Sequence, residues 1–255
     1  MCGRFSITAT PEDVEDLFAL DEVDPFPPRY NIAPTQPILM VRQTARAEPG
    51  SNRARREALL VRWGLIPSWV KDVKSFPLLI NARSETVMEK SSFRAAIRHR
   101  RTLVPASGFY EWKRSGEKKS YPYWVFPRHG GLVAFAGLME TYLAPDGSEI
   151  DTGAILTAQS NREFMPIHDR MPVIIQPEHF DRWLNTAEFE PRQVADLLTA
   201  AEPGFFDAIP VSEKVNKVAN TGPEIQERIN LNDPVDLDET KPAEKPVSKP
   251  QLKLF

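Results

Sequence analysis

The sequence has little cysteine and histidine, and these shortages exclude disulfide-linked and metal-binding folds. Its 255 residues contain one cysteine, 12 glycines and four histidines. A single cysteine excludes an internal disulfide, and the cysteine and histidines show no metal-ligand spacing. We therefore expect no metal and no cofactor. No apolar run approaches about 18 residues and no basic leader is present, which predicts a cytoplasmic protein without a membrane segment.

Several motifs and a strong positive charge are also missing. The chain contains no GxxxxGK[ST], GxGxxG, GxSxG or HExxH pattern, so these nucleotide, hydrolase and zinc-protease sites are not expected. The net charge is -3. Any contact with nucleic acid must therefore come from a local basic patch rather than from the overall charge.

Proline is abundant, and the apolar pattern is one of short segments. The 24 prolines indicate many short elements joined by rigid turns. We expect strands at 5–7, 38–41, 58–63, 78–82, 101–104, 109–113, 123–126, 132–138 and 155–157. We expect helices starting at Thr10-Pro11 and after Ser91 or Ser92, and at 177–184, 191–200 and 222–229. The absence of a βαβ rhythm favours an α+β fold: a single domain with a curled, largely antiparallel mixed sheet and short peripheral helices.

The last 24 residues differ from the rest in composition. Residues 232–255 contain four prolines, five acidic and four basic residues, which is typical of a disordered tail. The tail ends in an apolar cluster, Gln251-Leu252-Lys253-Leu254-Phe255, and such a cluster on a solvated tether indicates a short linear motif. We therefore divide the chain into a domain at 2–231 and a tail at 232–255.

The only cysteine, Cys2, follows the initiator methionine directly. Removal of Met1 would leave an α-amine and a thiol on neighbouring carbons. The amine of such a 1,2-aminothiol attacks a carbonyl to give an imine, and the thiol then closes a thiazolidine ring. An α-amine has a pKa of roughly 7.7–8.0 and lysine one of about 10.4, so the terminal amine is the better nucleophile near neutrality. The alternatives are a stray cysteine at a frayed terminus or a small apolar filler.

Three further polar residues have unusual surroundings. Glu111 lies in an aromatic run, where burial would raise its pKa and suit it to proton transfer; alternatively it lies on a half-exposed strand face near Lys113. His168 lies between apolar stretches and is a candidate general acid or a hydrogen-bonded structural histidine. Asn81 follows a hydrophobic strand and is either a strand terminator or an amide that orients a substrate.

Tryptophan and arginine supply the components of a surface for single-stranded nucleic acid. Aromatic rings stack on bases and guanidinium groups contact phosphates. Trp63 is expected in the core, because exposed tryptophans are uncommon. The remaining candidates are Arg4, Trp69, Arg83, Arg98 and Arg170.

Nine segments together resemble one family in order and spacing. They are MCGRF, NIAP, WGLIPSW, NARSET, VPASGFYEW, FAGLME, ILTAQSN, IHDRMPVII and VNKVAN. The chain resembles the SRAP family (SOS response-associated peptidase domain) over about residues 2–230. Members shield abasic sites in single-stranded DNA, and the resemblance implies a barrel-like core.

The resemblance also implies roles for individual residues. Cys2 would crosslink to the ring-opened abasic sugar as a thiazolidine, with Asn81 positioning the sugar and the nucleophile. Glu111 would handle protons during crosslink formation or reversal, and His168 would help to open the sugar ring. The family's DNA contacts fall on Arg4, Trp69, Arg83 and Arg170.

Two other functions stay open at this point. A cysteine peptidase would use Cys2 as a thiolate and His168 as its base, with self-processing as one outcome. A non-covalent single-strand binding module would not need Cys2. The tail segment QLKLF resembles the motif by which bacterial repair proteins dock on the DNA sliding clamp, with Leu254 and Phe255 filling a pocket and Gln251 as polar anchor beside Leu252. We expect a monomer.

Overall fold

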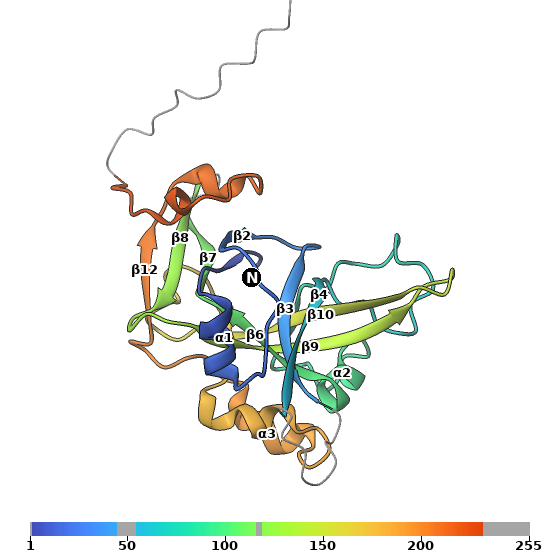
Figure 1. Ribbon diagram of the computed structural model, residues 1–255. Helices are drawn as coiled ribbons and strands as arrows, with labels where there is room; N and C mark the ends of the chain where they lie inside the picture. The colour runs from blue at the N-terminus through green and yellow to red at the C-terminus, as the bar shows by residue number, and fades with distance from the viewer. Residues whose placement is uncertain (1, 45–54, 116–118, 232–255) are drawn as a thin grey trace, which may run out of the picture.

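The computed structural model describes residues 2–44, 55–115 and 119–231. The tail and its QLKLF segment lie outside these residues. Within the described residues, twelve strands form two sheets, and three α-helices and four short 3-10 helices lie at the periphery (Figure 1). The strands are β1 Phe5–Ile7, β2 Arg29–Ile32, β3 Pro37–Gln43, β4 Arg56–Trp63, β5 Asn81–Arg83, β6 Arg101–Ala106, β7 Gly108–Ser115, β8 Lys119–Pro127, β9 Val133–Leu143, β10 Glu149–Gln159, β11 Arg170–Pro172 and β12 Phe206–Pro210.

The larger sheet closes on itself. Its strand order is β11-β10-β4-β3-β6-β9, and β9 also pairs with β10, so β10, β4, β3, β6 and β9 form a five-stranded barrel. The pairings of β10 with β4 and β5 are parallel, and the other strand pairs are antiparallel. The predicted α+β fold with a curled, mixed, largely antiparallel barrel is confirmed.

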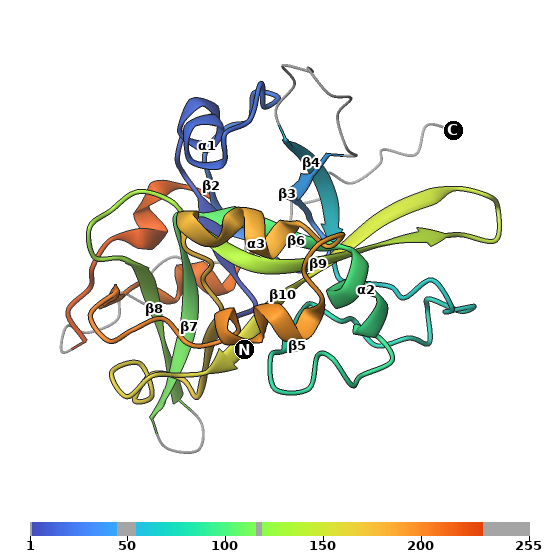
Figure 2. The ribbon, with the colours of Figure 1, turned by 90° about the horizontal axis from the view of Figure 1, so that it is seen from below.

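The second sheet brings the start of the chain to the barrel. Its order is β12-β8-β7-β1-β2, and β1 pairs with β7 through Phe5 opposite Phe109. Phe5 is fully buried and contacts Trp63 of the barrel, with ring centroids 5.2 Å apart. Figures 1 and 2 both place the N-terminus between the two sheets. Aromatic packing therefore holds β1 in place, and with it the residues just before it.

The helices follow local sequence signals, except at the cap of α2 and in the length and type of two later segments. Helix α1, Pro11–Phe18, begins at a Thr10 capping box as expected. Helix α2, Arg94–His99, has Phe93 at its N-cap, so the predicted serine cap is wrong: a turn from Lys90 already runs into the helix. The other helices are η1 Pro177–His179, α3 Phe180–Leu184, η2 Pro191–Leu197, η3 Glu213–Asn216 and η4 Pro223–Gln226. The segments expected as helices at 191–200 and 222–229 are thus shorter 3-10 turns.

One strand begins later than the sequence predicts. The expected strand at 78–82 is β5, Asn81–Arg83, and Leu79 forms only an isolated bridge with Leu65. Pro77 precedes the segment and cannot donate to a strand ladder, which fits the late start. Asn81 therefore opens the strand rather than ending it. Its pairing with Ile155 fixes it beside β10 of the barrel.

Candidate active site

Cys2 is held inside the protein at the junction of the two sheets. Its side chain is fully buried, which rules out the frayed terminus. Its backbone carbonyl accepts a hydrogen bond of 2.8 Å from Nδ2 of Asn81. Two residues further on, the carbonyl of Arg4 accepts from the amide of Tyr110 in β7 at 2.9 Å. The nucleophile candidate is thus fixed to β5 on one side and to β7 on the other.

The amide of Asn81 has unused hydrogen-bonding capacity. Its Nδ2 group serves Cys2, while its Oδ1 atom is buried and has no hydrogen-bond partner among the described residues. A buried acceptor without a partner costs roughly 1–3 kcal/mol. Such an atom is suited to accept a hydrogen bond from a bound ligand, or from an amine on Cys2.

Glu111 is a buried carboxyl group in the middle of β7. Its neighbours Tyr110 and Trp112 belong to a separate apolar cluster on the other face of the strand, as the alternation predicts. Glu111 is 2% exposed, so the half-exposed alternative near Lys113 is wrong. Burial raises the pKa of Glu111 from 4.5 to about 7. Near neutral pH the carboxyl group therefore exchanges a proton readily.

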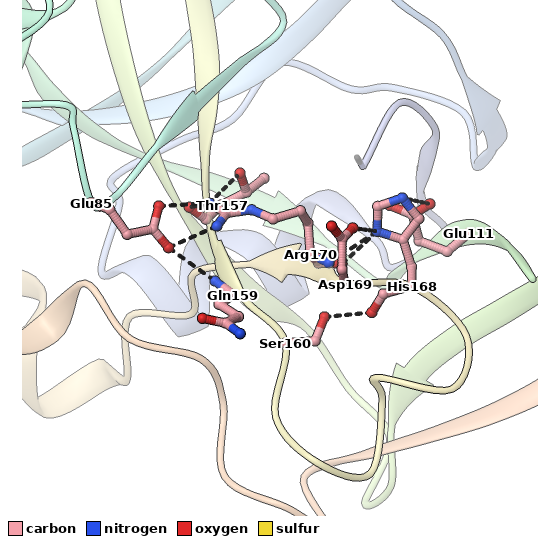
Figure 3. A network of polar contacts seen from close by, with 8 residues as sticks. All are labelled: Glu85, Glu111, Thr157, Gln159, Ser160, His168, Asp169 and Arg170. Carbon is pink, nitrogen blue, oxygen red and sulfur yellow. Dashed lines mark hydrogen bonds and ion pairs between the residues drawn. The ribbon is translucent and has the colours of Figure 1, made fainter.

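His168 faces Glu111 across the site (Figure 3), and its Nε2 lies 3.9 Å from Oε2 of the carboxyl group. The amide N–H of Arg170 donates to Nδ1 at 3.0 Å. With Nδ1 accepting, the proton of the neutral ring belongs on Nε2, toward Glu111. Burial lowers the pKa of His168, which favours this neutral form. The ring is therefore placed to pass a proton into the site.

The thiol of Cys2 is not a preformed thiolate. Burial raises its pKa well above the usual range, and the negative charge of Glu111 adds to the effect. Thiol nucleophiles in proteases depend on an electropositive setting that lowers the pKa. The site instead suits a reaction in which an amine attacks first and the thiol transfers its proton later.

The four predicted DNA contacts divide into two kinds. Arg4 donates to Oδ1 of Asn31 at 2.7 Å and to the carbonyl of Val215 at 2.8 Å. Arg170 is 11% exposed and forms a bidentate pair with Glu85, at 2.7 and 3.0 Å. Both guanidinium groups are engaged within the protein.

The other two predicted contacts are exposed. Arg83 lies on β5 two residues after Asn81, and its side chain has no hydrogen bond or ion pair among the described residues. Trp69 is 54% exposed and touches Phe76 edge-to-face, with ring centroids 5.6 Å apart. Trp63 is fully buried, as expected. Arg98 pairs with Glu190 at 3.5 Å.

Sequence reasoning missed the polar residues that support His168. Glu85, Thr157 and Ser160 all contact the His168–Arg170 turn (Figure 3). Thr157 and Ser160 lie shortly before the turn in sequence, whereas Glu85 lies far from it, and no spacing pattern connects Glu85 with His168. Within the described ranges, no three His, Cys, Asp or Glu side chains are grouped to hold a metal ion, and no helix is long and apolar enough to cross a membrane.

Comparison with known proteins assigns the chain to a family. The profile of the family described as "SOS response associated peptidase (SRAP)" matches residues 1–218. The chain belongs to this family. The SRAP chain is 39% identical over 230 residues to a Bacillus subtilis protein named abasic site processing protein YoqW, covering 89% of this chain and 99% of that one.

More distant relatives share the same kind of name. The Escherichia coli abasic site processing protein YedK is 32% identical, and the match covers 88% of this chain and 98% of YedK. The abasic site processing protein HMCES of Gallus gallus is also 32% identical, and the match covers 84% of this chain and 70% of HMCES. A crystal structure from Bacteroides thetaiotaomicron has the same fold, with a TM-score of 0.77, 24% identity and coverage of 90% of this chain and 100% of that one.

Proposed function

We propose that the protein captures abasic sites in single-stranded DNA through a covalent thiazolidine formed by Cys2 after removal of Met1. The observation that carries the proposal is the docking of Cys2 on Asn81 within the same buried site as Glu111 and His168. The names of the relatives, which describe abasic site processing, support the choice of substrate.

The chemistry begins at the sugar. An abasic deoxyribose is mostly a closed ring, and opening it to the aldehyde requires a proton on the ring oxygen. His168 carries a proton on Nε2 and lies within the site. In this role it acts as the general acid and leaves a free sugar hydroxyl. Glu111, 3.9 Å away, accepts the proton from the anomeric hydroxyl or returns one to His168.

The crosslink then forms in two steps. The α-amine of Cys2 adds to the aldehyde carbon and water leaves, which gives an imine. The sulfur next bonds to the imine carbon while the thiol proton moves to the nitrogen, so that the ring closes with the loss of one water in total. Because the pKa of Glu111 is about 7, its carboxylate accepts protons from the amine and its acid form protonates the leaving hydroxyl.

A denaturing gel tests the proposal directly. Protein lacking Met1 is incubated with an oligonucleotide that carries one abasic site, beside an undamaged control. The proposal predicts a heat-stable adduct with wild-type protein only on the abasic strand, and none with Cys2→Ala. Peptide cleavage without an adduct would instead support the cysteine peptidase. Equal binding of undamaged DNA by wild-type protein and Cys2→Ala, with no adduct, would support the non-covalent binding module.

We also propose that the tail docks on a bacterial sliding clamp through its last five residues. The support is the sequence QLKLF, in which Gln251, Leu252, Leu254 and Phe255 match the motif. Fluorescence anisotropy with a purified clamp checks this: full-length protein should bind, whereas Leu254→Ala with Phe255→Ala should not. Equal binding by both proteins would refute the docking motif.

A further inference from the structure

A turn carrying His168 is fastened to the barrel by contacts from separate segments. The hydroxyl of Ser160 donates to the carbonyl of His168 at 2.7 Å, and the amide of Ser160 donates to the carbonyl of Asp169 at 2.9 Å. Arg170 then enters β11 opposite Gln159 of β10. The backbone of residues 168–170 therefore has a defined place beside the end of β10.

The guanidinium group of Arg170 connects this turn to a segment that is distant in sequence. It donates to both carboxylate oxygens of Glu85, and to the carbonyl and Oγ1 of Thr157. Oε1 of Glu85 also accepts from the amide of Gln159 at 3.2 Å. Figure 3 shows Glu85 at one end of this network and His168 with Glu111 at the other. Glu85 thus joins the segment after β5 to β10 and β11.

The direction of one backbone amide decides the state of the His168 ring. The N–H of Arg170 points at Nδ1, while Oδ1 of Asp169 lies 3.1 Å and the carbonyl of Arg170 3.3 Å from the same nitrogen. If the amide turned away, these oxygens would favour a proton on Nδ1. The Nε2 proton that faces Glu111 would then be lost from the neutral ring. Contacts that hold the backbone amide of Arg170 in place therefore also favour the Nε2–H tautomer of His168.

Stability alone is a poor explanation for the pair. Glu85 is 48% exposed, so water screens its attraction to Arg170, although the Arg170 side chain itself is only 11% exposed. The bidentate geometry of the pair gives orientation more than energy. In metal sites, removal of the residue that orients a histidine ligand typically lowers metal affinity or activity about 10–100-fold. An orienting role for Glu85 toward His168 is comparable.

We propose that Glu85 is a positioning residue for His168, acting through Arg170 to keep the Nε2–H tautomer directed at Glu111. The catalytic consequence rests on the proposed function, because it concerns the proton that His168 delivers. The tautomer itself does not depend on that function, and it can be measured separately.

Nuclear magnetic resonance of the imidazole nitrogens tests the tautomer. Long-range proton–nitrogen spectra at pH 8 distinguish Nε2–H from Nδ1–H rings, and the spectrum of His168→Gln identifies the signals of His168. Wild-type protein and Glu89→Gln, a matched exposed control, should show Nε2–H. Glu85→Ala should show a mixed or Nδ1–H ring, and Glu85→Gln, which keeps one acceptor, an intermediate spectrum. An unchanged Nε2–H ring in Glu85→Ala would overturn the proposal.

Single-turnover kinetics at saturating protein tests the consequence. The adduct rate on abasic single-stranded DNA should fall about tenfold in Glu85→Ala and less in Glu85→Gln, with Glu89→Gln unchanged and melting temperatures similar. Tighter DNA binding by Glu85→Ala with an unchanged saturating rate would contradict the proposal. Glu85 would then only neutralise the charge of Arg170. If wild-type protein forms no adduct, the proposed function fails, while the spectra still decide whether Glu85 positions His168.

Discussion

The residues of the inner site and the outer residues Arg83 and Trp69 differ in their exposure to solvent and in their contacts. Cys2 and Glu111 are buried, Asn81 and His168 are half-buried, and all four lie within one connected site. Arg83 and Trp69 are exposed and have few partners among the described residues. Arg4 and Arg170, although cationic, belong with the inner group because their guanidinium groups are engaged.

This difference in exposure separates the residues proposed for the chemical steps from those proposed for DNA binding. Burial tunes the inner groups, since it sets the raised pKa of Glu111 and the lowered pKa of His168. That tuning costs stability, which proteins tolerate at functional sites. For the proposed binding of DNA the outer residues need no shifted pKa, because stacking and charge act best at an accessible surface. Substitutions inside should therefore change rates, and substitutions outside should change affinity.

The largest effect is expected at Cys2. Cys2→Ala keeps the α-amine but loses the sulfur, so adducts that survive heat should disappear completely. Cys2→Ser should yield an adduct only after borohydride reduction, because the imine forms but the ring does not close efficiently. Denaturing gels with and without borohydride measure both outcomes. Heat-stable adducts with Cys2→Ala at the wild-type level would show that another residue is the nucleophile.

Glu111→Gln should slow the reaction and stabilise the fold. Loss of a general acid–base group typically costs about 10²–10⁴-fold in rate. Because the folded-state pKa is raised from 4.5 to about 7, the folded state binds more protons between these values. The wild-type free energy of unfolding therefore falls as pH rises through this window.

At pH 8 the glutamine variant avoids this cost, and we expect a gain of up to about 3 kcal/mol. Urea unfolding at pH 4 and pH 8, with single-turnover rates between pH 5 and 9, checks both effects. In wild-type protein the rate should change with an apparent pKa near 7 that the variant lacks. A variant less stable than wild type at pH 8 would contradict the buried-acid description.

Trp69→Ala should weaken DNA binding without affecting the chemistry. Stacking of one base on an aromatic ring contributes about 1–3 kcal/mol, so we expect a loss of affinity of at least about fivefold. The saturating adduct rate should stay within about twofold of wild type. Anisotropy with undamaged single-stranded DNA measures the affinity. Leu143→Ala, another exposed apolar residue, is the control and should bind normally.

Arg83→Gln should give the smallest effect, a loss of affinity of a few-fold. Removing one phosphate contact should also lower the slope of log affinity against log salt by about one. Arg192→Gln, on η2, removes the same charge elsewhere and should leave the slope unchanged. Identical slopes for wild type and Arg83→Gln would remove Arg83 from the DNA-binding surface.

The sequence predicts the strands well where alternation and turns are local. It places Phe5–Ile7, Pro37–Gln43 and Arg101–Ala106 close to their observed positions, and it predicts the burial of Trp63. The late start of β5 and the cap of α2 were missed because tertiary pairing and a preceding turn decide them. The barrel also depends on a long-range pairing, the parallel contact of β4 with β10 that places Arg62 opposite Thr152.

The candidate site is only partly readable from the sequence. The aromatic neighbours of Glu111 indicate burial, and local motifs single out Asn81 and His168. The bond from Asn81 to the carbonyl of Cys2 and the pair of Glu85 with Arg170 join residues 79 and 85 positions apart. Such contacts exist only after the two sheets have come together.

The most direct test of the account asks whether both nucleophiles of Cys2 are consumed in the adduct. An imine and a thiazolidine are isomers with the same mass, so mass alone does not separate them. The purified adduct is therefore unfolded, treated with iodoacetamide, digested, and analysed by mass spectrometry. We expect a sugar-bearing peptide that begins at Cys2 and carries no alkyl group on sulfur. An alkylated sulfur in that peptide, or a sugar attached to a lysine, would contradict it.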